Sequence, residues 1–226
     1  MTEITPPQLV LLLLWGTVVA LDLVSVPQAL ISRPLVAGCV AGWIAGDVEA
    51  GLRAGVLFEL FALDVLPIGA VRYPDYGPAT VAAAALGAGV PWELGLGLGG
   101  TLGLVLAVAG GLSMQMVRRM NATAIQRHAA ALAAGESSAI RRLQYAGLLR
   151  DAARGAVLTA AGLAAAWALA VNLRLDRGTA LGLTLVCIGC ALAAAINGAV
   201  RSAGRGARLR WLAAGVAAGV LLAVLR

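Results

Sequence analysis

The sequence predicts an all-α, polytopic membrane protein with broken or re-entrant helical hairpins in its N-terminal half and a cytoplasmic amphipathic arm. Three observations favour this class. Of the 226 residues, 61% are hydrophobic and 12% are charged, whereas about a quarter of a soluble domain is charged. The apolar residues form runs long enough to cross a bilayer or about half of it. One long stretch between these runs is polar and rich in arginine, and the whole composition excludes a soluble enzyme or a disordered chain.

A long apolar run and a short one begin the N-terminal half. Residues 9–31 form the first run, and residues 34–46 form a second that is uncharged but too short to span a bilayer. We expect a re-entrant or half-crossing segment there. Gly38, Gly42 and Gly46 recur in it at the four-residue spacing that allows helices to approach closely.

Residues 54–71 are apolar except for two acidic residues, and a turn-rich stretch follows at residues 72–78. After this we expect a short segment, a break near residues 89–92 and a full crossing over residues 94–117. The run Gly95–Gly100 matches the pattern GxGxxG. We reject a nucleotide site because no strand precedes the pattern and its surroundings are apolar. Glycines at four-residue spacing favour helix packing instead.

Residues 118–154 are the long polar stretch. They hold seven arginines against Glu136 and Asp151, and their apolar residues recur at helical spacing. We therefore expect amphipathic helices that form a surface arm at the membrane interface. The lone histidine, His128, falls here and is interpreted as a solvated loop residue in preference to a phosphoryl acceptor.

The remaining apolar segments are residues 155–173, 179–200 and 211–225. Arginine is concentrated in 118–154 and 201–210, and two crossings separate these loops, so the positive-inside rule places both in the cytoplasm. The chain thus divides into an N-terminal hairpin and core membrane region with the solute site, the arm, and the C-terminal membrane helices, over residues 1–117, 118–154 and 155–226.

The net charge of +6 is explained by arginine-rich cytoplasmic loops, and we expect no nucleic-acid partner. Cys187 and Cys190 have the spacing of a redox or zinc pair, but no second pair and no nearby histidine accompany them. We interpret them as small apolar residues of a membrane helix, and we expect no metal and no cofactor.

Acidic residues inside the apolar segments are the candidates for function. Glu59 and Asp64 interrupt residues 54–71, and a carboxylate in a membrane is costly unless it is paired, hydrated or protonated. They are candidate solute-binding residues, with ion pairing to Arg53 or Arg72 as the structural alternative. Broken helices and buried carboxylates together indicate a transport site.

Two further residues belong to the candidate site. Asp75 follows Pro74 in the turn-rich stretch, where an Asx-type turn and a solute contact are both open. Gln28 supplies an amide in the first apolar run. A sugar-like polyol suits carboxylate and amide acceptors in such a cavity, but spacing alone does not identify the solute.

The stretch from Ser32 to Asp75 resembles the membrane-embedded IIC component of the mannose/fructose/sorbose-type phosphotransferase system. The resemblance covers residues 9–90 best, and the layout of the remainder agrees with it. The matching order is Arg33-Pro34-Leu35-Val36-Ala37, Gly46-Asp47, Gly51, Gly55, Glu59, Ala62-Leu63, Ile68-Gly69-Ala70 and Pro74-Asp75.

The resemblance implies a permease subunit of a phosphoenolpyruvate-dependent sugar phosphotransferase system in the bacterial cytoplasmic (inner) membrane. It implies a IID membrane subunit as partner, a homo-oligomer of IIC–IID pairs, soluble A and B components that deliver phosphate, and no phosphorylated or catalytic residue in this subunit. It also implies re-entrant hairpins and elevator-like transport. Glu59 falls on the family's intramembrane glutamate and would accept a sugar hydroxyl, and Asp75 falls on its Pro-Asp pair.

The chain departs from the family pattern at residues 26–30 and at Pro67, where members often carry other polar residues. These departures favour the alternative of a degenerate IIC-like scaffold or regulatory subunit that docks a partner through the arm and transports no sugar. An intramembrane enzyme is a weak third alternative because His128 lies away from every buried acid.

Overall fold

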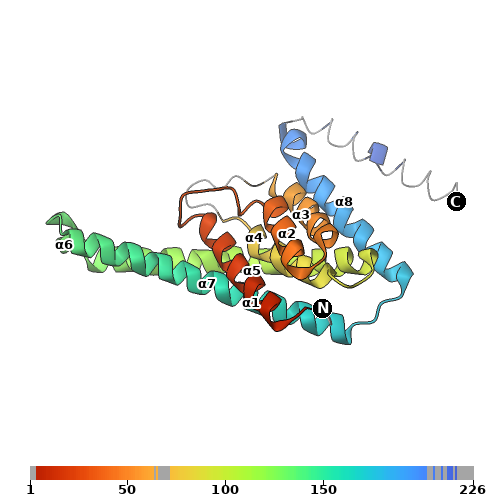
Figure 1. Ribbon diagram of the computed structural model, residues 1–226. Helices are drawn as coiled ribbons and strands as arrows, with labels where there is room; N and C mark the ends of the chain where they lie inside the picture. Colours follow the sequence, from red (N-terminus) through yellow and green to blue (C-terminus); the bar gives the residue numbers. More distant parts are fainter. Residues whose placement is uncertain are drawn as a thin grey trace.

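The computed structural model describes residues 4–63, 65 and 72–202, together with residues 206, 210, 213–215 and 217. In this part of the chain the secondary structure is entirely α-helical, which confirms the predicted fold class. The helices are α1 (Pro6–Asp22), α2 (Pro34–Ala45), α3 (Val48–Ala62), α4 (Tyr76–Gly87), α5 (Trp92–Arg127), α6 (Ala129–Ala133), α7 (Ser137–Asn172) and α8 (Arg177–Ser202) (Figure 1).

Three of the described helices are long and apolar enough to cross a membrane, namely α5, α7 and the part of α8 up to Asn197. The helices before α5 are shorter, at 12 to 17 residues. At 1.5 Å per residue, the shortest of them reaches about 18 Å, less than the hydrocarbon core of a bilayer. The expected short segments in the N-terminal half are therefore present as short helices.

The α2–α3 hairpin is held together by glycine. A Cβ atom added to Gly51 would lie 2.2 Å from the carbonyl oxygen of Gly38 and 2.7 Å from the Cα of Gly42. The two backbones thus touch directly, as the spacing of Gly38 and Gly42 predicts. Gly46 differs from this expectation: it ends α2 with a φ of 84°, a left-handed cap that favours glycine, instead of packing between helices.

Helix α4 lies at the centre of the bundle, where every residue from Gly77 to Gly87 is buried. It runs antiparallel to α5, since Gly95 meets Gly87 and Gly99 meets Ala83. These contacts confirm that the glycines of the formal GxGxxG pattern serve helix packing. The break between α4 and α5 comes at residues 88–91, with Gly89 at a φ of 76°.

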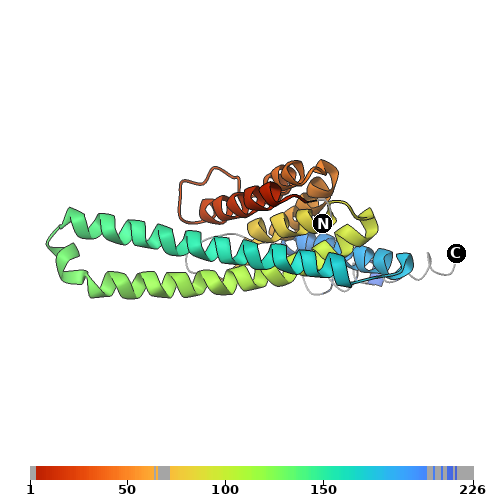
Figure 2. The same cartoon turned by 60° about the horizontal axis from the view of Figure 1, so that its bottom comes forward.

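Helices α5 and α7 each have 36 residues and extend together well beyond the other helices, with α6 at the tip (Figure 2). The crossing and the arm that the sequence separates at residue 117 are therefore parts of one continuous helix. The same holds at residue 154 in α7. The arm is formed by the extensions of α5 and α7, and the base of the arm is therefore packed within the bundle.

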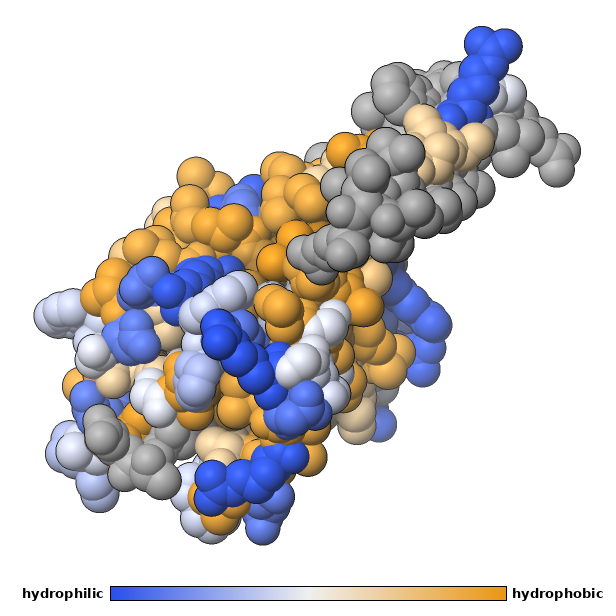
Figure 3. Space-filling view, turned by 90° about the vertical axis from the view of Figure 1, so that its right-hand side faces the viewer, coloured by the Kyte–Doolittle hydropathy of each residue, from blue (hydrophilic) through white to orange (hydrophobic). Residues whose placement is uncertain are grey.

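The bundle has two ends. The arm, the loop after α1 and the end of α3 lie at one of them, and the turns after α2, α4 and α7 lie at the other (Figure 1). Helix α8 runs parallel to α5, with Gly97 against Thr184 and Gly100 against Cys187, so it ends on the arm side. Apolar side chains cover much of the outer surface (Figure 3), as expected of a protein surrounded by lipid or by partner helices.

Candidate functional site

A pocket of about 130 Å³ opens at the arm end of the bundle. Three segments form its walls: the loop between α1 and α2, the end of α3, and the segment that leads into α4. Its lining combines an amide, a guanidinium, a hydroxyl and two tyrosines with apolar side chains, as is usual for small-molecule sites. The lining residues are Leu23, Gln28, Leu30, Ser32, Arg33, Pro34, Ala62, Val65, Tyr73, Pro74, Tyr76 and Gly77.

The first wall is shaped by a buried carboxylate. Asp22, at the end of α1, accepts hydrogen bonds from the backbone N–H groups of Ala29 at 2.6 Å and Ser32 at 2.9 Å. These bonds fold the loop back toward α2, and Leu30 adopts a φ of 63° within it. Asp22 is fully buried. Its carboxylate therefore holds the loop of the first wall in shape and does not contact the solute.

Glu59 lies on α3 and forms an ion pair with Arg33. Its second carboxylate oxygen accepts the backbone N–H of Leu35 at 3.2 Å, in the first turn of α2. A carboxylate at a helix N-terminus is favoured by the helix dipole. Arg33 in turn lines the pocket. The partner of Glu59 is thus an arginine of the Arg-Pro pair, whereas Arg53, one of the two arginines considered from the sequence, pairs with Glu49.

Gln28 lies in the first wall and lines the pocket, with its side-chain amide donating to the carbonyl oxygen of Leu23 at 3.0 Å. The candidate Asp64 and the departure at Pro67 lie outside the described residues.

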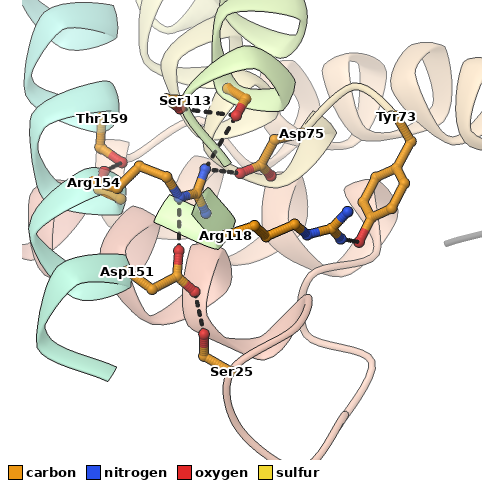
Figure 4. Close-up of polar contacts among 10 residues, drawn as sticks. Ser25, Tyr73, Asp75, Ser113, Arg118, Asp151, Arg154 and Thr159 are labelled. Carbon is orange, nitrogen blue, oxygen red and sulfur yellow. Dashed lines mark hydrogen bonds and ion pairs between the residues drawn. The ribbon is translucent and has the colours of Figure 1, made fainter. Parts of the chain in front are cut away.

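Asp75 is fully buried behind the third wall, at the N-terminus of α4. Its Oδ2 accepts a hydrogen bond from Nη1 of Arg154 at 2.7 Å, and Nε of Arg154 bonds Asp151 at 2.6 Å (Figure 4). Asp151 also accepts a hydrogen bond from the hydroxyl of Ser25, which belongs to the first wall. We name Ser25, Asp75, Asp151 and Arg154 the clasp. Two carboxylates and one guanidinium leave it with a net charge of −1.

Aromatic rings complete the third wall. Arg118 of α5 donates to the hydroxyl of Tyr73 at 2.9 Å, and its guanidinium lies 5.3 Å from the centre of that ring. Tyr76 stacks on Phe61 with ring centres 6.2 Å apart. The pocket therefore has rigid aromatic surfaces beside its polar groups.

The structure therefore places Gln28 and Arg33 in the lining of one pocket, with Glu59 paired to Arg33 outside that lining and Asp75 buried behind the third wall. Sequence reasoning missed Arg33, Tyr73 and the clasp residues of α7. Arg33 belongs to the Arg-Pro motif, which was used only to identify the family resemblance. Asp151 and Arg154 are spaced i, i+3 with opposite charges at the edge of an apolar segment, a signal of a paired and buried site. Within the described residues, no group of three or more histidine, cysteine, aspartate or glutamate side chains is placed to hold a metal.

Comparison with known proteins gives a family match. The family model described as "PTS system sorbose-specific iic component" matches residues 7–194. The PTS system sorbose-specific EIIC component of Klebsiella pneumoniae is 33% identical over 105 residues, covering 46% of this chain and 38% of that protein. The PTS system mannose-specific EIIC component of Escherichia coli (strain K12) is 30% identical over 157 residues, covering 69% of this chain and 57% of that protein. The chain thus matches less than two thirds of the length of either relative.

Two solved structures share the fold. One, titled only as a membrane protein, has a TM-score of 0.69 at 24% identity, covering 99% of this chain and 96% of the other. The second is the mannose transporter ManYZ in complex with microcin E492, with a TM-score of 0.60 at 23% identity, covering 99% of this chain and 95% of the other. At these identities the likeness shows the all-helical membrane fold.

Proposed function

The chain belongs to the family of phosphotransferase-system sorbose-specific IIC components, and on this premise we propose that it is the subunit that binds and translocates a sugar across the bacterial inner membrane. The observation that carries the proposal is the pocket at the arm end. It offers an amide, a guanidinium and tyrosine rings within one small volume, and the guanidinium is paired with the Glu59 carboxylate beside it. This combination suits a polyol, whose hydroxyls both donate and accept hydrogen bonds while its C–H faces rest on aromatic rings.

Glu59 is the proposed acceptor for a sugar hydroxyl. Its side chain keeps 22% of its surface exposed, so it is not sealed by the pair with Arg33. Arg33 then acts as a donor to a second hydroxyl, and Gln28 as a further partner. Asp75 contributes by holding the third wall, because its side chain is 1% exposed and committed to Arg154. Asp64 stays a proposed contact on the strength of the sequence alone.

The membrane side follows from charge. The arm carries the arginine excess, so we place it in the cytoplasm together with the segment 201–210. The pocket opens at the arm end, and this conformation therefore faces inward. A sugar in such a pocket is accessible to soluble A and B components that deliver phosphate. A IID-like membrane subunit and a homo-oligomer of the resulting pairs complete the proposed assembly, and the mannose-specific and sorbose-specific relatives make mannose and sorbose the first sugars to test.

The test replaces Glu59 by glutamine and, as matched control, Glu49 by glutamine. Both acids lie on α3 and pair with an arginine, but Glu49 is 74% exposed and lies in the first turn of α3, outside the pocket lining. Phosphoenolpyruvate-dependent uptake of mannose and of sorbose is measured in cells that supply the IID, A and B proteins. We expect uptake to fall at least about tenfold in E59Q, since a hydrogen bond to a charged group contributes about 1.5–3 kcal/mol, and to persist in E49Q.

Each variant's amount in the membrane is measured in parallel, so that a loss of folding is separated from a loss of binding. Uptake that survives in E59Q at normal abundance would refute the role of Glu59. An absence of uptake and of sugar binding in the wild-type complex would instead favour the scaffold alternative.

A further inference from the structure

The clasp joins the two pocket walls that are far apart in sequence. Ser25 belongs to the loop after α1, and Asp75 to the segment before α4. Ser25 donates to Asp151 of α7, and Asp75 accepts from Arg154 of α7 (Figure 4). Arg154 and Asp151 are themselves paired, so the two walls are linked through this pair. The backbone of α5 takes part as well, because Arg154 Nη1 also bonds the carbonyl oxygen of Gly110 at 3.4 Å. The Arg154 guanidinium therefore joins α7, α5 and the segment before α4, and Asp151 adds the loop after α1.

The position of the clasp is the base of the arm. Gly110 precedes the first arm arginine, Arg118, by about 12 Å along α5 at 1.5 Å per residue. Arg118 itself holds Tyr73 of the third wall. Contacts from the two helices that project beyond the bundle thus reach the first and third walls, in addition to the contacts that Asp22 and Glu59 make with the first wall.

The clasp is incompletely satisfied. The side chains of Asp75, Asp151 and Arg154 are 1%, 2% and 4% exposed, so water does not compensate their charges. Among the described residues, Asp75 Oδ1 and Arg154 Nη2 are buried without a hydrogen-bond partner. Buried polar groups are normally paired, and a cluster evolved only for stability is better served by apolar side chains. The free-energy cost of burying these unpaired polar atoms indicates that the clasp holds a particular geometry.

We infer that Arg154 is a positioning residue of the pocket: it holds the segment 72–75 directly, and the loop 23–33 through Asp151, in the arrangement that receives the solute. The inference rests on the proposed function for the identity of the solute. The ordering of both walls by Arg154 does not depend on the proposed function. Arginine is suited to this task because its planar fork reaches several acceptors at once, which a lysine ammonium at the end of a flexible chain does not.

The variants are Arg154→Lys and Arg154→Gln, with Arg150→Lys and Arg150→Gln as controls. Arg150 lies one turn earlier on α7 and bonds Asn121 of α5 at 2.8 Å, so its hydrogen bond joins the two arm helices to each other. Backbone hydrogen exchange is measured by mass spectrometry on the purified full chain in detergent without sugar. Peptides covering 23–33 and 72–79 report the walls, and peptides covering α2–α3 and α8 report the rest of the bundle.

We expect both wall peptides to exchange about tenfold faster in R154K, in line with the loss of a charged hydrogen bond, while the α2–α3 peptides stay as in the wild type. Both Arg150 variants are expected to leave the walls unchanged. A purely structural ion pair predicts the reverse for R154K, since the retained positive charge would restore protection everywhere. Wall exchange equal to the wild type, or faster exchange spread evenly over all peptides, would overturn the inference.

Ser25→Ala keeps the test informative where an Arg154 variant does not fold. It removes one neutral donor to Asp151 and leaves every charge in place. We expect faster exchange in residues 23–33 only, and an unchanged 23–33 peptide would contradict the clasp. Mannose affinity by calorimetry on the complex with its membrane partner is the second measurement, with a loss of at least about tenfold expected in R154K. A wild type that binds neither mannose nor sorbose would refute the proposed function while leaving the exchange result to decide on Arg154.

Discussion

Replacing Gly51 by alanine tests how the α2–α3 hairpin is held, and this hairpin carries Glu59. The added Cβ would lie 2.2 Å from the carbonyl oxygen of Gly38 and 2.7 Å from the Cα of Gly42. A carbon and a carbonyl oxygen come no closer than about 3.3 Å even in weak hydrogen bonds. The helices must therefore separate by about 1 Å, because both neighbours are backbone atoms that cannot rotate away.

The expected cost follows from two opposing effects. Overpacking costs about 1–3 kcal/mol, and rigid backbone neighbours place this position at the upper end, near 3 kcal/mol. Alanine returns about 1 kcal/mol of helix propensity relative to glycine. The net destabilisation is then about 2 kcal/mol, which for a chain of this size lowers the unfolding temperature by about 4–8 °C.

The assay is thermal unfolding of the purified protein in one detergent, followed by circular dichroism at a fixed scan rate. Gly182→Ala is the control, since Gly182 lies in α8 with no atom within 4 Å of the added Cβ, and it is expected to melt at or slightly above the wild-type temperature. A G51A protein that melts with the wild type would refute the close backbone contact. Equal decreases of the unfolding temperature in G51A and G182A would show that the effect does not come from the close backbone contact at Gly51.

Two further predictions concern the segment before α4 and the turn before α8. Tyr73→Phe removes the hydroxyl that accepts from Arg118 and keeps the ring under its guanidinium, so the same melting assay should show a loss of about 2–4 °C, whereas Tyr145→Phe on the exposed arm should show none. The pKa of Asp176 lies below its ordinary value because the hydroxyl and the backbone N–H of Thr179 donate to its carboxylate. Its support of the start of α8 is therefore present above pH about 4 and lost as the pH falls through the lowered pKa. A carbon-13 carboxyl titration should find the pKa of Asp176 raised by Thr179→Val, and an unchanged pKa would contradict this hydrogen-bonded turn.

Much of the architecture was predictable because it depends on composition and local spacing. The short segment 34–46, the break near residues 89–92 and the glycine packing of Gly95 and Gly99 are properties of neighbouring residues along one helix. The structure shows all three. At residue 117 the hydropathy changes while helix propensity does not, and α5 continues unbroken to Arg127.

The candidate site was predictable in part. Glu59 and Gln28 were recognised because a carboxylate or an amide in an apolar run is costly and therefore conspicuous. Their partners were not, because pairing depends on which helix faces which. Arg53 is nearer in sequence to Glu59 than Arg33 is, yet the hairpin turns Arg33 toward Glu59 and leaves Arg53 to Glu49.

The sequence by itself determined that this is a membrane protein and that its N-terminal half is built from short helices. It also determined that few charged residues interrupt the apolar segments. Composition and hydrophobic run length suffice for this, because each apolar segment responds to the bilayer separately. Only the tertiary structure decided that Ser25, Asp75 and Arg154, which lie on three separate segments, meet at the base of the arm. Buried charges far apart in sequence acquire their partners through helix packing, and that packing depends on the complementarity of all the helices at once.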